Sequence, residues 1–284
     1  MTAPEPTHTS KSVRTSIKVR APEFEFGPDV PRYWLFGSPR ATHLVNGLNL
    51  LFPLGERFFV RSVRHYQARI DDPQLRADIR GFMAQEVRHG LEHEHFFDRL
   101  RAQGYEIDAF LKRYEEIAFG QIERLSPPAL RLAVTAALEH YTAVLAERAL
   151  TENVLDHAHP EMAELLRWHA AEEIEHKAVA FDVLATVAPS WLLRAAGITL
   201  GGAMLGTFWI AAIRMLVEQD RAAGRLVPEP DFQQLRERRG ELPGVLSRAM
   251  LRYLKPGFHP NDHADRALAA KFFAGWSRSV KAAA

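Results

Sequence analysis

Two stretches of the sequence, Gln85-Glu86-Val87-Arg88-His89 and Glu173-Ile174-Glu175-His176, contain the same Glu-x-x-His motif. On a helix, residues three apart lie on one face, so a carboxylate and an imidazole can reach one metal ion together. A single pair is common by chance in a chain of 284 residues. Its repetition on two separate predicted helices is much rarer, and it predicts a helical bundle with metal in its core.

The segments around these motifs have the composition and the caps of four long helices. Ala, Leu, Glu and Arg dominate them, and alternating strand patterns are sparse, which indicates an all-α protein. Several starts carry a capping residue followed by Pro, as in Asp72-Pro73 and Ser126-Pro127. The predicted helices cover residues 42–69, with an irregular turn at 53–55, then 72–103, 126–156 and 159–187.

The connections between these helices predict how they are arranged. A few residues separate the first helix from the second and the third from the fourth, which indicates two antiparallel hairpins. About 22 residues, 104–125, separate the hairpins, and we expect them to include a helix. Two hairpins joined by one long crossover form the ferritin-like version of the four-helix bundle. The expected organisation is a flexible tail (1–23), a bundle with its lead-in (24–188) and a C-terminal helical extension (189–284).

The composition excludes several classes of function. The chain has 36 Lys and Arg against 35 Asp and Glu, a balance that does not favour a nucleic-acid partner. It has no cysteine, which excludes disulfides, thiolate zinc sites and iron–sulfur clusters. Any metal must therefore have nitrogen and oxygen ligands. The first 23 residues lack the apolar core of a secretion signal, which predicts a cytoplasmic protein.

Two further glutamates complete a candidate metal cage. Glu56 and Glu139 each lie in an apolar stretch of one of the other two predicted helices, where a lone carboxylate is costly. The order along the chain is therefore Glu, Glu-x-x-His, Glu, Glu-x-x-His, one set for each hairpin. We expect Glu56 and Glu139 to bridge the metals. The predicted ligands are Glu56, Glu86, His89, Glu139, Glu173 and His176.

The charge of this set indicates two metal ions. Four carboxylates packed inside a bundle would repel one another and take up protons unless cations neutralise them. Two divalent ions supply about four positive charges. Carboxylates and imidazoles without sulfur suit iron, with manganese as the alternative and zinc less specifically. The competing interpretation, that the glutamates lie on solvated helix faces, conflicts with their apolar neighbours.

Other side chains are candidates for places around the cage. His169 and His93 lie on the same helical faces as the predicted ligands, so each is a candidate extra ligand or a support for one. Glu172 competes with Glu173 for the ligand role, although the repeated three-residue spacing favours Glu173. Each ligating histidine needs an acceptor for its other N–H group. Asp182 and Glu147 are the candidate acceptors.

A wider set of segments accompanies the cage: Pro31-Arg32-Tyr33-Trp34, Phe52-Pro53-Leu54-Gly55-Glu56-Arg57-Phe58-Phe59, Gln85-Glu86-Val87-Arg88-His89, Glu139-His140-Tyr141-Thr142-Ala143, Trp168-His169, Ala180-Phe181-Asp182 and Gly257-Phe258-His259-Pro260. With these segments, residues 17–260 resemble the bacterial predicted metal-dependent hydrolases, a branch of the ferritin-like di-metal superfamily. The pattern His169-x-x-x-Glu173-x-x-His176 also resembles the third-histidine pattern of di-iron arylamine N-oxygenases, which implies a ligand role for His169. Those enzymes have Asp where this chain has Gln85.

One segment after the predicted bundle is strongly apolar. Residues 195–213 contain no charged side chain and are near the length that spans a bilayer. The pairs Gly197-x-x-x-Gly201 and Gly202-x-x-x-Gly206 allow close helix contact in a membrane or in a protein. Three interpretations stay open: a helix buried against the bundle or at a homodimer interface, a helix in a membrane interface, or a transmembrane helix.

The leading functional hypothesis is a di-iron oxidoreductase. It would activate dioxygen with the help of an electron donor and oxidise a small organic substrate. The channel for that substrate is expected to be lined by Phe52, Phe82 and Tyr141. The first alternative is a hydrolase whose paired metals generate a hydroxide from bound water. The second alternative is a non-enzymatic metal-binding or storage protein.

Overall fold

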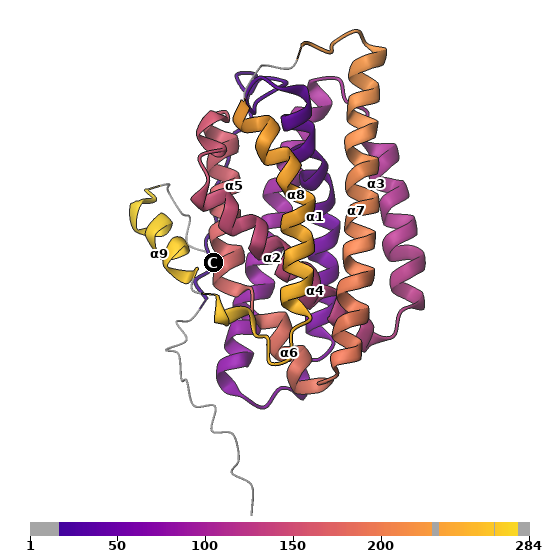
Figure 1. The fold of residues 1–284 in the computed structure, drawn as a ribbon, viewed down its shortest axis with the longest axis vertical. Coiled ribbons are helices and arrows are strands. Elements are labelled where there is room, and N and C mark those ends of the chain that lie inside the picture. The colour runs from indigo at the N-terminus through magenta and orange to yellow at the C-terminus, as the bar shows by residue number, and fades with distance from the viewer. Residues whose placement is uncertain (1–16, 229–232, 264, 278–284) are drawn as a thin grey trace, which may run out of the picture.

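Four long helices form the centre of the protein in the computed structural model (Figure 1). The structure describes residues 17–228, 233–263 and 265–277, and these residues form helices and no strand. The all-helical prediction is therefore confirmed. The four central helices are α1 (Pro39–Arg64), α2 (Pro73–Ala102), α4 (Pro128–Thr151) and α5 (Pro160–His176).

The central helices pair as the short connections predict. α1 packs along α2, and α4 packs along α5. On the second pair, Glu139 faces His176 and Thr142 faces Glu173. Positions therefore rise along α4 as they fall along α5, which makes the pair antiparallel. The crossover between the pairs contains α3 (Asp108–Tyr114) and a π-helix (Glu115–Glu123), so the helix expected there is present.

The helix ends follow the predicted caps with some shifts. The Asp72 carboxylate accepts a hydrogen bond from the Gln74 N–H and caps α2 as expected, whereas α1 begins at the Ser38 cap. Pro53 lies inside α1 without ending it.

The fourth helix is shorter than predicted. It ends at His176, and α6 (Val179–Val187) begins after a turn. In that turn the buried Lys177 ammonium bonds the Asp265 carboxylate and the His263 carbonyl oxygen. This tie to the C-terminal segment fixes the turn at the end of α5.

The C-terminal region adds α7 (Trp191–Ala222), α8 (Gln233–Tyr253) and α9 (Arg266–Gly275). α7, which contains the apolar segment, runs along the bundle against α4 and α1 (Figure 1). A Cβ atom at Gly197 would lie 2.5 Å from the Ala133 carbonyl oxygen, so glycine permits this close approach. Among the described helices, α7 has the length and hydropathy to cross a membrane, features that the core helix of a soluble protein can also have. Contact with a membrane or with a second copy stays a prediction.

A buried polar cluster holds the C-terminal end of α7 in place. The Asp220 side chain is fully buried. Its carboxylate accepts hydrogen bonds from the Tyr105 hydroxyl at 2.9 Å and the Tyr33 hydroxyl at 3.0 Å. His43 Nε2 of α1 lies 2.6 Å from the same carboxylate. We call these four residues the Asp220 cluster; they tie α1, α7 and two loops together.

Candidate metal centre

All six predicted ligands meet in the core of the four central helices. α1 and α4 each contribute one glutamate, while α2 and α5 each contribute a Glu-x-x-His pair. Each of the six side chains is almost inaccessible to solvent. The sequence therefore placed these residues together correctly, and their role as metal ligands stays a prediction. The buried set is Glu56, Glu86, His89, Glu139, Glu173 and His176.

One end of the set is centred on His176. Its Nε2 atom lies 3.1 Å from Glu86 Oε1, 3.4 Å from Glu139 Oε2 and 3.5 Å from Glu173 Oε1. Glu86, Glu139 and His176 can offer ligand atoms that all lie within 4.8 Å of one another. This spacing suits three ligands around one cation.

The other end of the set includes His169. Its Nε2 atom lies 2.9 Å from Glu173 Oε1 and 3.8 Å from Glu56 Oε1. Glu56, His89 and His169 form a second group whose ligand atoms lie within 4.8 Å of one another. His169 therefore belongs to the cage geometrically, as the candidate extra ligand.

The two ends share carboxylates, but not those expected from the sequence. Glu86 belongs to the His176 group and to a further group with His89 and Glu173. Glu173 also lies within 4 Å of His169, His176 and His89. Glu56 and Glu139, which the sequence suggested as bridges, each belong to one group. The geometry thus favours the motif glutamates as the shared ones, because they lie between the two ends.

The hydrogen bonding of these atoms provides a test of whether the cage suits a metal. In the described part of the chain, both carboxylate oxygens of Glu56, Glu86 and Glu139 are buried without a hydrogen-bond partner. The same holds for His89 Nδ1 and for His176 Nε2, whose close approach to Glu86 Oε1 lacks the direction of a hydrogen bond. Buried polar atoms are nearly always satisfied in proteins. Eight potential metal-ligand atoms, six carboxylate oxygens and two imidazole nitrogens, thus lie in one small volume without hydrogen bonds. This arrangement fits a site for cations.

The pKa values of the cage residues also fit a site for cations. Burial, followed by the charges of the neighbouring carboxylates, raises the pKa of Glu56 well above its usual range. Burial also raises the pKa of Glu139 well above that range. Burial and the nearby His169 hold the pKa of His89 well below its usual range, so this imidazole is neutral and able to bind a metal. Without cations the cage thus favours protonated Glu56 and Glu139. Glu173 differs, because despite its burial the neighbouring His176 holds the pKa of Glu173 well below its usual range.

A second layer of groups fixes the orientation of the two motif histidines. His89 Nε2 lies 3.0 Å from Glu172 Oε2, which leaves Nδ1 facing the cage. His176 Nδ1 lies 2.9 Å from Gln85 Oε1, which leaves Nε2 facing the cage. The geometry therefore favours Glu173 over Glu172 as the candidate ligand, because Glu173 reaches the cage and Glu172 lies against the outer nitrogen of His89. Such partners set the tautomer and orientation of a metal-binding imidazole.

The predicted acceptors Asp182 and Glu147 are wrong. Asp182 lies on α6, beyond the turn that ends α5, and bonds His259. Glu147 pairs with His263.

One residue near the cage, Arg20, was not predicted from the sequence. Its guanidinium donates to Glu172 at 2.9 Å and to Glu175 at 2.8 Å. Arg20 lies in residues 1–23, which were expected to form a tail. Residues 1–16 are outside the described chain, whereas Arg20 is buried against the bundle. Nothing in the sequence around Arg20 indicates this contact.

Comparison with known proteins identifies a family. The profile of a family described as "Predicted metal-dependent hydrolase" matches residues 18–264. The chain belongs to this family. No curated protein and no solved structure gives a significant match. Membership supports dependence on metal and favours the hydrolase alternative over the leading oxidoreductase hypothesis. It does not test the resemblance to the ferritin-like superfamily or to the arylamine N-oxygenases.

His93 lies next to the cage and contacts it through His169. Its Nε2 atom lies 2.6 Å from His169 Nδ1, so the two imidazoles form a buried pair. The Phe52 ring contacts both, with centroid distances of 4.8 Å. Phe82 packs on the His176 ring at 4.9 Å, and Tyr141 lies in the same hydrophobic core as Phe82.

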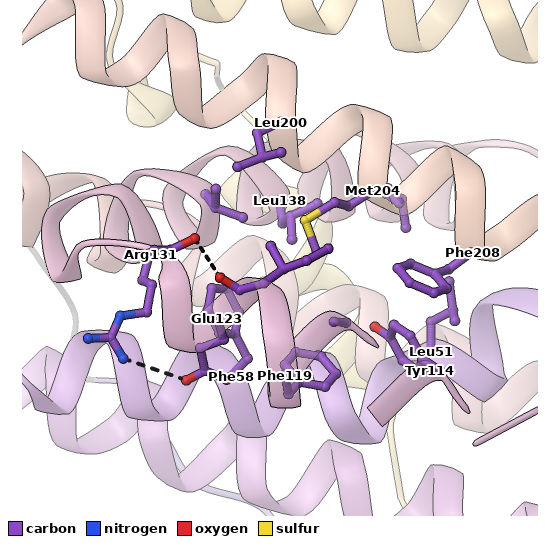
Figure 2. Close-up of a pocket in the computed structure, with 16 residues that line it drawn as sticks. Leu51, Phe58, Tyr114, Phe119, Glu123, Arg131, Leu138, Leu200, Met204 and Phe208 are labelled. Carbon is purple, nitrogen blue, oxygen red and sulfur yellow. Dashed lines mark hydrogen bonds and ion pairs between the residues drawn. The ribbon is translucent and has the colours of Figure 1, made fainter. Parts of the chain in front are cut away.

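Two cavities flank this centre. The larger, of about 230 Å³, reaches His169 and Glu173 and has Phe52 in its wall. Phe82 and Tyr141, also expected in a channel, are not among its lining residues. The smaller cavity, of about 60 Å³, lies between α1, the π-helix, α4 and α7. Figure 2 shows its apolar lining and, at one side, the Glu123 carboxylate near Arg131. No predicted ligand lines it, so the larger cavity is the candidate substrate site.

Proposed function

We propose that the chain hydrolyses a small organic substrate at a centre of two divalent metal ions. The observation that carries this proposal is a group of eight buried potential ligand atoms that have no hydrogen-bond partner among the described residues. They belong to Glu56, Glu86, Glu139, His89 and His176. Membership of a predicted metal-dependent hydrolase family supports the reaction class.

The donor groups suggest how the ions would be held. Glu139 and His176 would hold one ion, while Glu56, His89 and His169 would hold the other. Glu86 and Glu173, which lie between the groups, would be shared. When bound, such ions lower the pKa of a coordinated water toward neutrality and so provide a hydroxide nucleophile.

The surrounding residues would keep these groups in place and limit the access of water. Thr142 Oγ1 hydrogen-bonds Glu173 Oε2, which fixes the carboxylate at the end of the larger cavity. His93 holds the His169 ring through the contact between Nε2 and Nδ1. Phe52 covers both imidazoles with an apolar ring. Fixed ligands and an apolar wall are the features that position a reactive group and strengthen electrostatic interactions.

A di-iron oxidoreductase of ferritin-like ancestry is the second candidate function. The observation that favours it is the donor set, in which four glutamates outnumber three histidines and no sulfur is present. Oxygen-rich sets of this kind suit iron or manganese. Iron would supply dioxygen activation, and an electron donor would be required.

Metal analysis followed by turnover assays separates these candidates. Protein purified without chelators is expected to contain about two metal ions per chain, following the pairing of charges in the cage. Protein reconstituted with a redox-inert ion is expected to hydrolyse some esters or amides of a test panel under anaerobic conditions. The His176→Ala variant is the inactive control. Turnover that requires both iron and dioxygen would favour the oxidoreductase, and bound metal without any turnover would favour a metal-binding protein.

A further inference from the structure

The larger cavity has a distinct floor, wall and rim. At the floor lie His169 and Glu173, whose side chains are 5% and 4% exposed. The wall is formed by apolar side chains of several helices, among them Leu48 of α1 and Ala149 of α4. At the rim, the side chain of Arg148 is 24% exposed. The cavity therefore leads from the surface along an apolar wall to the candidate metal centre.

We infer that this cavity binds an uncharged substrate with an apolar body of about six to eight carbon atoms, whose reactive group lies at the floor. The identity of the reaction rests on the proposed function. The binding of the apolar body does not, because the wall residues are not predicted ligands.

The volume sets the size of this body. A buried apolar cavity of about 150 Å³ is enough to hold a benzene ring. The cavity here, of about 230 Å³, exceeds this volume by about half and adjoins the floor residues directly. A short alkyl chain or a single ring with a side arm would therefore fill it.

The rim argues against an acidic substrate. Arg148 is the cation in the lining, but its guanidinium lies 2.7 Å from Glu152 and 3.2 Å from Glu241. Two carboxylates thus neutralise the one positive group that could attract an anionic head group. The local excess of negative charge lowers the concentration of anions at the entrance.

The floor provides few polar groups besides the cage itself. Thr142 contributes a hydroxyl, and this group already donates a hydrogen bond to Glu173. An ester or amide placed there would be the polar end of an otherwise apolar molecule. Its hydrolysis adds water across the acyl bond and yields a carboxylic acid with an alcohol or an amine.

Calorimetric titration of the metal-loaded protein with 1-butanol, 1-hexanol and 1-octanol tests the binding directly, without turnover. Each methylene is expected to tighten Kd about fourfold until the cavity is filled. Sorbitol, a six-carbon polyol, and 1-hexanesulfonate, an anion that coordinates metals poorly, are expected to bind at least roughly tenfold more weakly than 1-hexanol. A Kd independent of chain length, or equal binding of the sulfonate, would overturn the inference.

Two variants and a matched control locate the binding. Ala149→Phe places a ring in the cavity and is expected to weaken 1-hexanol binding at least roughly tenfold, because apolar volume is lost. Leu48→Ala enlarges the cavity and is expected to raise the chain length at which affinity stops improving. Ala211→Phe adds the same ring at an exposed position of α7, outside the lining, and is expected to leave binding unchanged. Thermal unfolding checks that each variant is folded.

The outcomes separate this inference from the proposed function. If the alcohols bind as described but no ester or amide is hydrolysed, the proposed function fails and the binding site stands. If hydrolysis occurs and Ala149→Phe changes neither its KM nor alcohol binding, the site assignment fails and the proposed function stands.

Discussion

The protein contains two buried polar clusters that differ in how their carboxylates are satisfied. The cage holds Glu56 on α1, and the Asp220 cluster holds His43 on the same helix. The two positions are thirteen steps apart along the chain, which corresponds to about 20 Å along the helix axis. Both clusters are inaccessible to solvent, so burial alone does not distinguish them.

The difference lies in the partners of the oxygens. The single carboxylate of the Asp220 cluster accepts from two tyrosine hydroxyls and contacts an imidazole. In the cage, Glu139 has two buried oxygens and no hydrogen-bond partner among the described residues. A buried carboxylate whose oxygens have partners is costly to disrupt, whereas several unsatisfied ones together favour the binding of cations or protons. The comparison leads us to expect a structural role for Asp220 and a binding role for the cage, and both expectations can be tested.

The largest expected effect is the loss of metal from a cage variant. Glu86→Gln removes a charge shared by the two donor groups, so the variant is expected to purify with little or no bound metal. Because it also removes a buried carboxylate, the metal-free variant is expected to unfold at or above the temperature of the metal-free parent. Elemental analysis and thermal unfolding measure both effects. Full metal content in this variant would show that the cage is assigned incorrectly.

Asp220→Asn is expected to show the opposite behaviour. Breaking the Asp220 cluster should lower the free energy of unfolding by about 3 kcal/mol, as for other buried charged pairs that lose a partner. Metal content per folded chain should be unchanged, because sites this far apart act independently. Denaturant unfolding and elemental analysis provide the measurements. A loss of metal equal to that of Glu86→Gln would contradict the separation of the two clusters.

Loss of a residue that supports the cage is expected to have an intermediate effect on metal affinity. Arg20→Gln removes the guanidinium that holds Glu172, the partner of His89, so metal affinity is expected to fall by about 10- to 100-fold. Arg88→Gln is the matched control, since Arg88 bonds the same N-terminal segment through the Pro22 carbonyl but does not contact Glu172 or Gln85. Competition with a metal chelator measures both. Equal effects of the two substitutions would remove the specific role of Arg20.

The smallest expected effect is a pH dependence of the stabilisation by metal. The pKa values of Glu56 and Glu139 are raised by burial in the metal-free cage. Their favourable contribution to folding is therefore present at low pH and is lost as the pH rises through these raised values. Bound metal prevents that loss, so the gain in Tm on adding metal should increase with pH. The expected scale is roughly 3 °C for each kcal/mol of added free energy of unfolding. A gain in Tm that falls with rising pH would contradict the protonation described for the cage.

The sequence predicted the parts of the centre that follow from helical periodicity. The spacing of Glu86 from His89 and of Glu173 from His176 repeats on two helices, and the apolar neighbours of Glu56 and Glu139 indicate burial. The approximate positions of the four helices follow from their caps and composition, and the length of the crossover led us to expect a helix there. These are local patterns, so they can be read from adjacent residues.

Features that depend on distant contacts could not be predicted. The division of roles among the glutamates depends on which carboxylates lie between the two donor groups. Gln85 appeared as a departure from a known pattern, whereas it accepts from His176 in the structure. Gly90, one turn beyond Glu86, leaves room for the Glu56 carboxylate, since a Cβ atom there would lie 3.1 Å from Oε2. The end of α5 at His176 depends on a contact of Lys177 with Asp265, 88 residues away.

The contact of Arg20 with Glu172 also has a consequence for biosynthesis. The two residues are 152 positions apart, so Arg20 leaves the ribosome long before its partner is made. This contact can therefore form only after α5 has been translated. Long-range contacts of this kind form late, because the intervening chain must first be ordered. The contact of the N-terminal segment with α5 is thus expected to follow the pairing of α1 with α2 in the nascent protein.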